Sequence, residues 1–171
     1  MSSVLLALAA SAALAQAPSP PAAPDYAALT VLEGAWEATT VGAAGAVGHA
    51  RIVNQCARVG RNYACQQVVD GRAGAMIVFV PGPAPGRWWT GYVSPSGEGS
   101  RGRGELTIAG PVWTYSSKSE VSAAGGGGTW TRNTNTYAGR DRIHFQIESS
   151  TDGGKTWVLG MSGDEVRVGR E

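Results

Sequence analysis

Hydrophobic and polar residues alternate along most of this chain, with the period of two that half-buried β-strands require. The clearest example begins at Ile143, where Ile143, Phe145 and Ile147 alternate with polar residues before a turn and a second strand. Similar stretches recur and predict ten strands. We expect them near residues 35–41, 47–58, 62–69, 75–80, 87–94, 101–108, 112–117, 129–137, 142–149 and 155–161.

Short segments rich in Gly, Pro, Asn and Asp separate these stretches, as hairpin turns do. Asp25 is placed to cap one short helix that runs to Leu32 and ends at Gly34. No run of helical period interrupts the strands. The sequence therefore predicts an all-β fold, either a sandwich or an antiparallel up-and-down barrel of about eight to ten strands. We favour the barrel because closure removes exposed sheet edges.

The first residues have the pattern of a secretory signal peptide. Residues 4–10 form a short apolar run, and Ala13-Leu14-Ala15 is a small-x-small cleavage site, although no Lys or Arg precedes the run. We expect a signal peptide at 1–15, a Pro-rich leader at 16–24 and one β-barrel domain at 25–171, a length that suits a single domain. The mature chain is expected to be periplasmic or secreted, with no membrane span.

Cys56 and Cys65 are the two cysteines of the chain. A two-residue hairpin turn at Gly60-Arg61, with Gly at the first position, suits a type II′ turn and places the two cysteines opposite each other. Counting pair types outward makes them a non-hydrogen-bonded pair with Cα atoms about 4.5 Å apart. No CxxC motif or nearby His suggests metal binding or catalysis. We therefore predict a structural disulfide, which an oxidising compartment would allow to form.

Charge and motifs narrow the possible functions. The net charge is only +1 and 16% of residues are charged, so we expect neither nucleic acid nor an anionic membrane as a partner. The sequence contains no phosphate-binding loop, no His-Glu-x-x-His, no Gly-x-Ser-x-Gly and no cluster of His and carboxylates at metal-ligand spacing. We therefore expect a protein that is not an enzyme and holds neither a cofactor nor a metal.

Leu32-Glu33-Gly34-Ala35-Trp36 is a Gly-x-Trp motif that enters the first strand after a short helix. Together with the terminal Ser-x-Asp-Gly-Gly-Lys-Thr-Trp hairpin and the predicted signal peptide, this motif makes the chain resemble the lipocalin-like (calycin) barrels. Among these it resembles uncharacterised exported bacterial proteins. The resemblance implies an antiparallel barrel around an apolar cavity. It also implies that Trp36 closes one end of the barrel and, with Gly34, is structural.

Ser150-Thr151-Asp152-Gly153-Gly154-Lys155-Thr156-Trp157 also matches the Asp-box of sialidase-type propellers. In that motif the Asp accepts backbone hydrogen bonds and the Trp packs beneath the turn, so it is a folded hairpin and not a catalytic device. The motif occurs once, and the chain is too short for a six-bladed propeller. Asp152 and Trp157 are therefore predicted to be structural.

The polar face of the strand at 142–149 leaves two alternatives. If Gly139-Arg140 is a two-residue turn, Asn133, Asn135 and Tyr137 share a face with His144. That face is either a solvated exterior, opposite a core that includes Trp130, Thr134 and Phe145, or a set of polar groups that orient a ligand in the cavity. Ligation of a haem by His144 has no support from its neighbours. A register error of one residue would exchange the faces.

The leading hypothesis is a non-catalytic exported barrel that binds a small, mainly apolar molecule. The alternative is a structural or protein-interaction module of the cell envelope with a filled barrel, and an enzyme ranks third. Adjacent Trp88 and Trp89 must point to opposite faces, so one of them faces outward. The candidate ligand-binding residues are Trp113, Tyr115, Trp130, Arg132, His144, Phe145 and Gln146.

Overall fold

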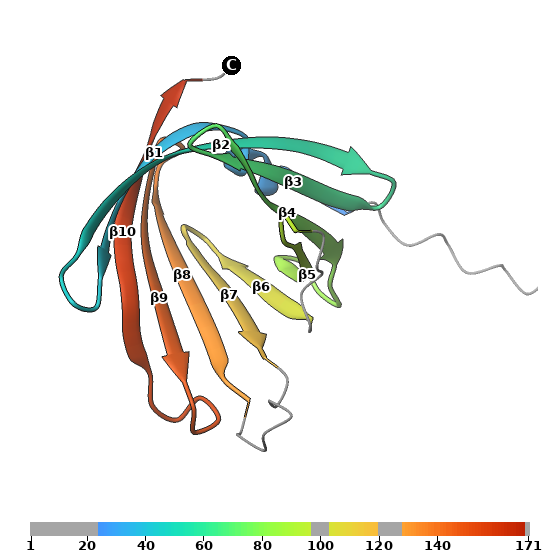
Figure 1. Ribbon diagram of the computed structural model, residues 1–171. Coiled ribbons are helices and arrows are strands. Elements are labelled where there is room, and N and C mark those ends of the chain that lie inside the picture. The colour runs from blue at the N-terminus through green and yellow to red at the C-terminus, as the bar shows by residue number, and fades with distance from the viewer. Residues whose placement is uncertain (1–23, 97–102, 120–127, 170–171) are drawn as a thin grey trace, which may run out of the picture.

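Ten antiparallel strands form a closed barrel in the computed structural model, which describes residues 24–96, 103–119 and 128–169 (Figure 1). The strands are β1 (Gly34–Gly42), β2 (Val47–Val59), β3 (Asn62–Val69), β4 (Arg72–Pro81), β5 (Arg87–Val93), β6 (Gly104–Ala109), β7 (Val112–Lys118), β8 (Trp130–Ala138), β9 (Arg142–Ser150) and β10 (Val158–Gly169). Each strand pairs with the next along the chain, and β10 pairs with β1 to close the ring. The predicted fold class, an antiparallel up-and-down barrel, is confirmed.

The N-terminal helix is shorter than the sequence predicts. Only a single 3-10 turn, η1 (Leu29–Leu32), forms. The Asp25 carboxylate accepts a hydrogen bond from the amide of Ala27 at 2.9 Å, and no side chain caps η1 itself. Trp36 Nε1 donates to the carbonyl of Leu32 at 3.2 Å, which ties η1 to the first strand.

The last strand differs most from the prediction, which placed it at 155–161. It is β10, which begins at Val158 and continues to Gly169. The strand starts late because Asp152 accepts hydrogen bonds from the amides of Lys155 and Thr156, so these amides are not available to a sheet ladder. The predicted signal peptide at 1–15, most of the predicted leader, and the predicted first two residues of the sixth strand lie outside the described residues.

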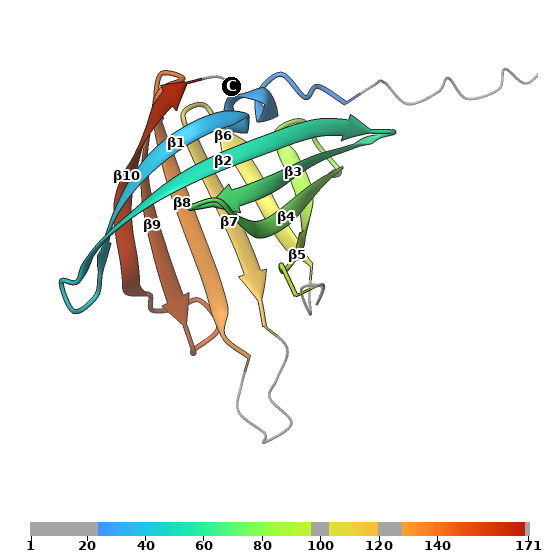
Figure 2. The ribbon, with the colours of Figure 1, turned by 45° about the horizontal axis from the view of Figure 1, so that its top comes forward.

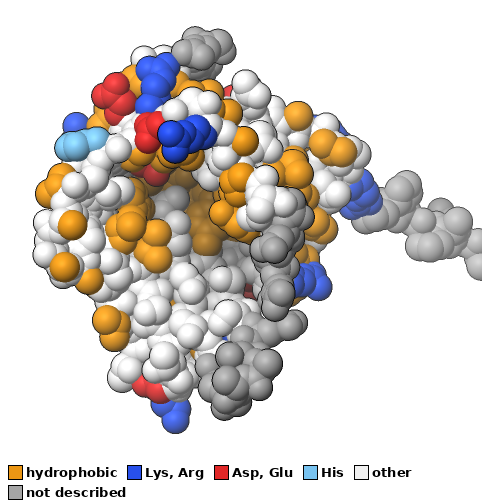
Figure 3. All heavy atoms as spheres, in the orientation of Figure 1, with side chains coloured by type: hydrophobic (Ala, Val, Ile, Leu, Met, Phe, Trp, Pro, Cys, Tyr) orange, Lys and Arg blue, Asp and Glu red, His pale blue; other side chains and the backbone are white. Residues whose placement is uncertain are grey.

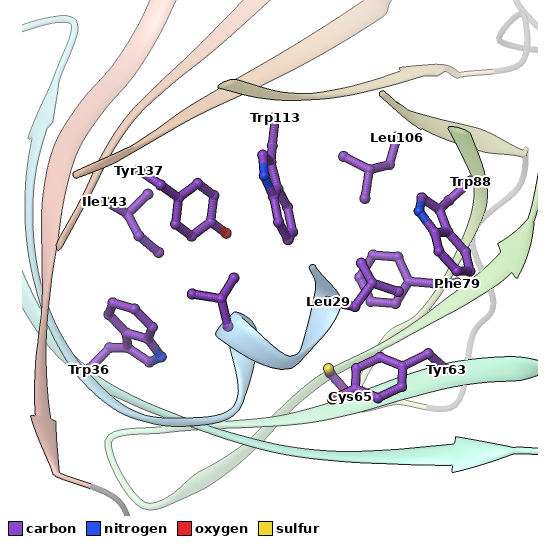
Figure 4. Packing of buried hydrophobic residues seen from close by; sticks show 11 residues of the cluster. Leu29, Trp36, Tyr63, Cys65, Phe79, Trp88, Leu106, Trp113, Tyr137 and Ile143 are labelled. Atoms are coloured by element: carbon purple, nitrogen blue, oxygen red, sulfur yellow. The ribbon is translucent and has the colours of Figure 1, made fainter. Parts of the chain in front are cut away.

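The hydrophobic core fills one end of the barrel (Figure 4). This is the end at which η1 lies (Figure 2). Large aromatic and aliphatic side chains from eight strands form this core. They point toward η1, where Leu29 is completely buried (Figure 4). The most deeply buried large side chains are Trp36, Phe79, Leu29 and Leu106. The opposite end, where β8 and β10 begin, lacks such a plug among the described residues. This asymmetry leaves room for a cavity farther along the barrel.

Gly34 and Trp36 hold the packed end together with Arg167. The guanidinium of Arg167 lies 4.1 Å from the centre of the Trp36 ring and donates to the carbonyl of Val31 at 2.7 Å. Gly34 has φ +114°, and a Cβ atom at this position would lie 2.6 Å from Arg167 Nη1. The backbone conformation therefore favours Gly here, because side chains rarely adopt this φ.

The predicted disulfide is present and bridges the hairpin of β2 and β3. Val59 pairs with Asn62 across the two-residue turn, and Cys56 pairs with Cys65. Their Cα atoms are 4.1 Å apart, close to the expected distance. Gly60 has φ +60°, as the first position of a type II′ turn requires. The local alternation and the turn residues were sufficient to predict this pairing.

The register between β8 and β9 corrects the prediction. The turn contains three residues, Gly139 to Asp141, so Ala138 pairs with Arg142 and Tyr137 pairs with Ile143. This shift by one residue turns Asn133, Asn135 and Tyr137 into the barrel, together with Ile143, Phe145 and Ile147. It also places Trp130 and Thr134 on the outer face, where the prediction had them in the core.

Trp88 and Trp89 do point to opposite faces. Trp88 is buried in the packed end, and its ring centre lies 5.5 Å from that of Tyr26. Trp89 faces outward and is half-buried, because the Arg103 guanidinium lies 3.6 Å from the centre of its ring. The outward Trp is thus covered in part by an arginine that directly precedes β6.

Candidate functional site: a cavity inside the barrel

A cavity of about 500 Å³ lies inside the barrel, next to the packed core. Figure 3 shows a hollow in this face of the molecule, with hydrophobic side chains in its wall. The volume falls within the range of small-molecule sites in proteins. The lining residues are Leu32, Trp36, Asn54, Cys65, Gln67, Ile77, Phe79, Tyr92, Tyr115, Thr131, Asn133, Asn135, Ile143, Phe145, Ile147, Met161 and Glu165.

The apolar part of the wall is formed mainly by alternate residues of β4 and β9. Ile143, Phe145 and Ile147 follow one another along the inner face of β9. The ring of Phe145 extends over Gly163 of β10, where a Cβ atom would lie 2.7 Å from Phe145 Cζ. Because Gly163 has no side chain, the ring of Phe145 can approach the backbone of β10 this closely.

A polar strip crosses this apolar wall along β8. Thr131, Asn133 and Asn135 are alternate residues of the strand, and all three line the cavity. The Oδ1 atoms of Asn133 and Asn135 are buried and have no hydrogen-bond partner among the described residues. Asn54 Oδ1 is in the same situation, although its Nδ2 donates to the carbonyl of Leu32 at 3.0 Å. Buried acceptors without partners are costly, so these oxygens mark where a ligand or water would donate hydrogen bonds.

Glu165 is the one charged residue among the described residues that line the cavity. It lies on β10 opposite Ala38 and Ile143. Burial raises the pKa of its carboxyl group above the usual 4.5. Burial of Tyr115 raises the pKa of its hydroxyl well above 10.0, and electrostatic repulsion from Tyr137 and Glu165 adds smaller contributions, so this phenol stays neutral. A carboxyl group therefore faces an otherwise uncharged, largely apolar space.

The structure brings together only part of the predicted ligand-binding set. Tyr115 and Phe145 line the cavity. Trp113 is buried in the packed end, with its ring centre 4.6 Å from that of Tyr137, and does not reach the cavity wall. The other four residues, Trp130, Arg132, His144 and Gln146, belong to the outer face of β8 and β9 and do not line this cavity.

Arg132 and His144 of the predicted set contact other residues on the outer face of the barrel. Arg132 forms an ion pair with Glu148 at 2.8 Å, and its guanidinium lies 4.2 Å from the centre of the Trp157 ring. His144 Nδ1 lies 3.2 Å from a carboxylate oxygen of Asp164, with both side chains exposed by about half. A haem inside the barrel could therefore not be ligated by His144.

The Ser150–Trp157 hairpin has the geometry that its motif predicts. Asp152 accepts hydrogen bonds from the hydroxyl and amide of Thr156, from the Ser150 hydroxyl and from the amide of Lys155. These hydrogen bonds, those of Thr156 first, lower the pKa of the Asp152 carboxyl group well below its usual value. Trp157 Nε1 donates to the carbonyl of Gly154 at 3.0 Å. The carboxylate is thus fully engaged in holding the turn, away from the cavity.

Sequence reasoning found the polar residues of the cavity only in part. It placed Asn133 and Asn135 on one face with His144, and one of its two alternatives put that face inside the cavity. The turn after β8 was counted one residue short, so His144 was grouped with them although it lies on the outer face. Glu165 was missed because the last strand was expected to end at residue 161. The available signal for a longer strand was the period of two in which Met161, Gly163 and Glu165 alternate with their neighbours. The pattern was hard to recognise because its middle position is a glycine, which has no side chain.

Across residues 24–96, 103–119 and 128–169, no three His, Cys, Asp or Glu side chains gather where they could hold a metal ion. In the same ranges, no helix has the length and hydrophobicity needed to span a bilayer.

No protein-family model and no curated protein sequence matches this chain. Among solved structures, it is similar to Rv2717c from M. tuberculosis, with a TM-score of 0.51 and 17% identity over 84% of this chain and 97% of that one. It is also similar to the S-type phycobiliprotein lyase CPES from Guillardia theta, with a TM-score of 0.51 and 11% identity over 85% and 93% of the two chains. At these identities the likeness shows a shared barrel fold, which is consistent with a lipocalin-like barrel.

Proposed function

We propose that this protein is a lipocalin-like barrel that binds a small, mainly apolar molecule in its interior cavity. The observation that carries the proposal is the cavity itself, which has about 500 Å³ of space beside a well-packed core. A wall of aromatic and aliphatic side chains with a few convergent polar atoms is the usual composition of a small-molecule site. A barrel filled by its own side chains, the alternative, would leave no such space.

The unpartnered oxygens of Asn133 and Asn135 support the same proposal. In a barrel whose interior only needed to be filled, apolar side chains at these positions would avoid the cost of burying amides, about 1–3 kcal/mol for each unsatisfied group. Here the amides lie on the cavity wall, where a bound molecule reaches them. We propose a binding role without catalysis, since the cavity wall holds a single carboxyl group and the phenols of buried or half-exposed tyrosines.

An extracytoplasmic location is part of the proposal. It is supported by the Cys56–Cys65 disulfide, which persists in oxidising compartments, and by the apolar run at 4–10 with its small-x-small site. The location can be tested by expressing the full chain in a bacterium and sequencing the N-terminus of the periplasmic product. Cleavage after Ala15 is the expected result, and recovery of the uncleaved chain from the cytoplasm alone would contradict it.

The binding proposal is tested with an uncharged apolar dye, N-phenylnaphthylamine, whose fluorescence rises in apolar surroundings. We expect saturable one-to-one binding to the oxidised protein. Ile147→Trp fills the cavity from the inner face of β9 and should weaken dye binding at least about tenfold, because the added ring takes the space of the ligand. Gln146→Trp is the matched control, since it introduces the same side chain at the adjacent outward position.

The outcomes separate the two candidate functions. Loss of binding in Ile147→Trp with retention in Gln146→Trp places the dye in the cavity. Equal effects of both variants, or no saturable binding by the wild type, would contradict the proposal and favour the interaction module. Circular dichroism of both variants checks that the barrel is intact.

A further inference from the structure

Glu165 is a carboxyl group without a counter-charge, and this feature narrows the ligand class. No Lys, Arg or His forms an ion pair with it among the described residues, and no hydrogen bond to its carboxyl oxygens occurs there. Arg167, two residues along β10, is occupied by the carbonyls of Val31 and Arg140 and by the Asp141 carboxylate. A desolvated carboxylate that lacks a partner destabilises the protein, unless a bound molecule supplies the missing charge.

Apart from Glu165, the polar groups that line the cavity are uncharged amides and hydroxyls, and aromatic rings lie among them. Asn133 and Asn135 present buried carboxamide oxygens that have no hydrogen-bond partner among the described residues. Tyr115 and Phe145 contribute aromatic rings to the wall. Acceptors bind N–H donors, and aromatic faces attract cations by about 0.5–2 kcal/mol each. No positively charged side chain lines the cavity within the described residues, so nothing there would compensate an anionic ligand.

We propose that the cavity selects an organic amine, that is, a mainly apolar molecule with one protonated nitrogen placed against the Glu165 carboxylate. The remaining N–H groups of the ammonium would donate to the carboxamide oxygens of β8, and the apolar body would lie along β4 and β9. This proposal rests on the proposed ligand-binding function and adds to it the charge of the ligand. A neutral analogue would leave Glu165 unpaired, and a carboxylate would place two like charges in an apolar space.

The test compares three ligands of equal chain length, decylamine, decanol and decanoate, as competitors of bound N-phenylnaphthylamine at about pH 8, where the amine is protonated and carboxylates are ionised. For the wild type we expect decylamine to bind about tenfold more tightly than decanol or better, and decanoate to bind most weakly. A tenfold difference is the size expected when one charge-assisted pair is formed in a desolvated site.

The variant Glu165→Gln keeps the shape of the side chain and removes its charge. It should weaken decylamine binding about tenfold and leave decanol binding within about twofold to threefold. Asp164→Asn is the matched control, because it changes the net charge by the same amount at the adjacent position of β10, where the carboxylate faces outward and its side chain is 59% exposed. This control should leave the order of the three ligands unchanged.

The outcomes distinguish this inference from the function on which it rests. Suppose that the dye binds and decanol competes with it. If decylamine then binds no more tightly than decanol, or if Glu165→Gln does not weaken decylamine binding, the amine proposal is wrong while the binding proposal stands. Tightest binding of decanoate would also overturn it. If the dye does not bind the wild-type barrel at all, both proposals fail together.

Discussion

Gly163 offers a sharp test of how β10 and β9 form the cavity wall. Its Cα faces the interior between Met161 and Glu165. A Cβ atom there would lie 2.3 Å from the carbonyl oxygen of Thr39 and 2.7 Å from Phe145 Cζ. In contrast, a Cβ atom at Gly160 would have its nearest neighbour, the carbonyl oxygen of Ile147, at 3.6 Å, which is ordinary contact. The two glycines of one strand therefore differ in whether the fold has room for a methyl group.

Gly163→Ala must either separate β10 from β1 or push the Phe145 ring into the cavity. Overpacking of this kind costs about 1–3 kcal/mol. The lower entropy of the unfolded chain offsets about 0.4–1 kcal/mol of that loss. We expect a net loss of about 1–2 kcal/mol in the free energy of unfolding, or roughly 2–8 °C in Tm for a domain of this size. Gly160→Ala should be neutral or slightly stabilising, because only the entropic contribution remains.

The measurement is denaturant unfolding of both oxidised variants and the wild type, followed by tryptophan fluorescence. The affinity of Gly163→Ala for N-phenylnaphthylamine should also fall if the Phe145 ring moves into the cavity. If Gly163→Ala is as stable as Gly160→Ala, the close contact of Phe145 with β10 and the derived shape of the cavity wall would both be refuted.

Further predictions concern the packed end, the disulfide, the cavity and the terminal hairpin. Trp36→Ala should lower the free energy of unfolding by about 3–5 kcal/mol, measured by denaturant unfolding, because a fully buried ring is removed; a loss below about 1 kcal/mol would contradict its place in the core. Replacing Cys56 and Cys65 together by Ala should cost about 2–3 kcal/mol, since the unfolded chain loses a short closed loop, and an unchanged unfolding midpoint under oxidising conditions would argue against the bridge. Burial raises the pKa of Glu165, so the folded state binds its proton more tightly than the unfolded state does, and the contribution of this group to stability is lost as pH rises through the folded pKa. Glu165→Gln should therefore gain thermal stability over the wild type as pH increases above about 4.5, and a constant difference in Tm across pH would contradict the burial of the carboxyl group. Asp152→Asn should speed hydrogen exchange at the amides of residues 155 and 156, because these amides donate to the Asp152 carboxylate; unchanged exchange in the variant would show that the carboxylate does not hold the turn. In the wild type, the protection of these amides against exchange should persist on acidification until well below the usual carboxyl pKa, because the folded pKa of Asp152 is lowered.

Local patterns were sufficient for the secondary structure and the class of fold. The period of two, interrupted by turn residues, predicted ten strands, because each strand buries one face and each reversal needs Gly, Asn, Asp or Pro. The Cys56–Cys65 pairing followed from the length of one short turn. The hairpin around Asp152 was also legible, since its hydrogen bonds join residues within four positions of one another.

The candidate site could not be derived in this way. Whether Asn133 and Asn135 face the interior depends on a turn of two or three residues at Gly139, and the sequence there is compatible with both. A shift of one residue exchanges the faces of a strand, so a small local ambiguity became a large error about the site. The sequence did indicate Tyr115 and Phe145, because aromatic residues at inward positions of strands are expected to pack inside.

The sequence by itself thus determined the strands, most turns, the disulfide and the barrel class, all of which depend on interactions between residues close along the chain. Only the tertiary structure decided that the barrel is packed at one end and hollow beside it, and that Glu165 faces the hollow without a counter-charge. These features arise when β10 pairs with β1, more than a hundred residues away in the chain. Closure then determines the sheet register and the direction of each side chain, and no local pattern encodes that long-range pairing.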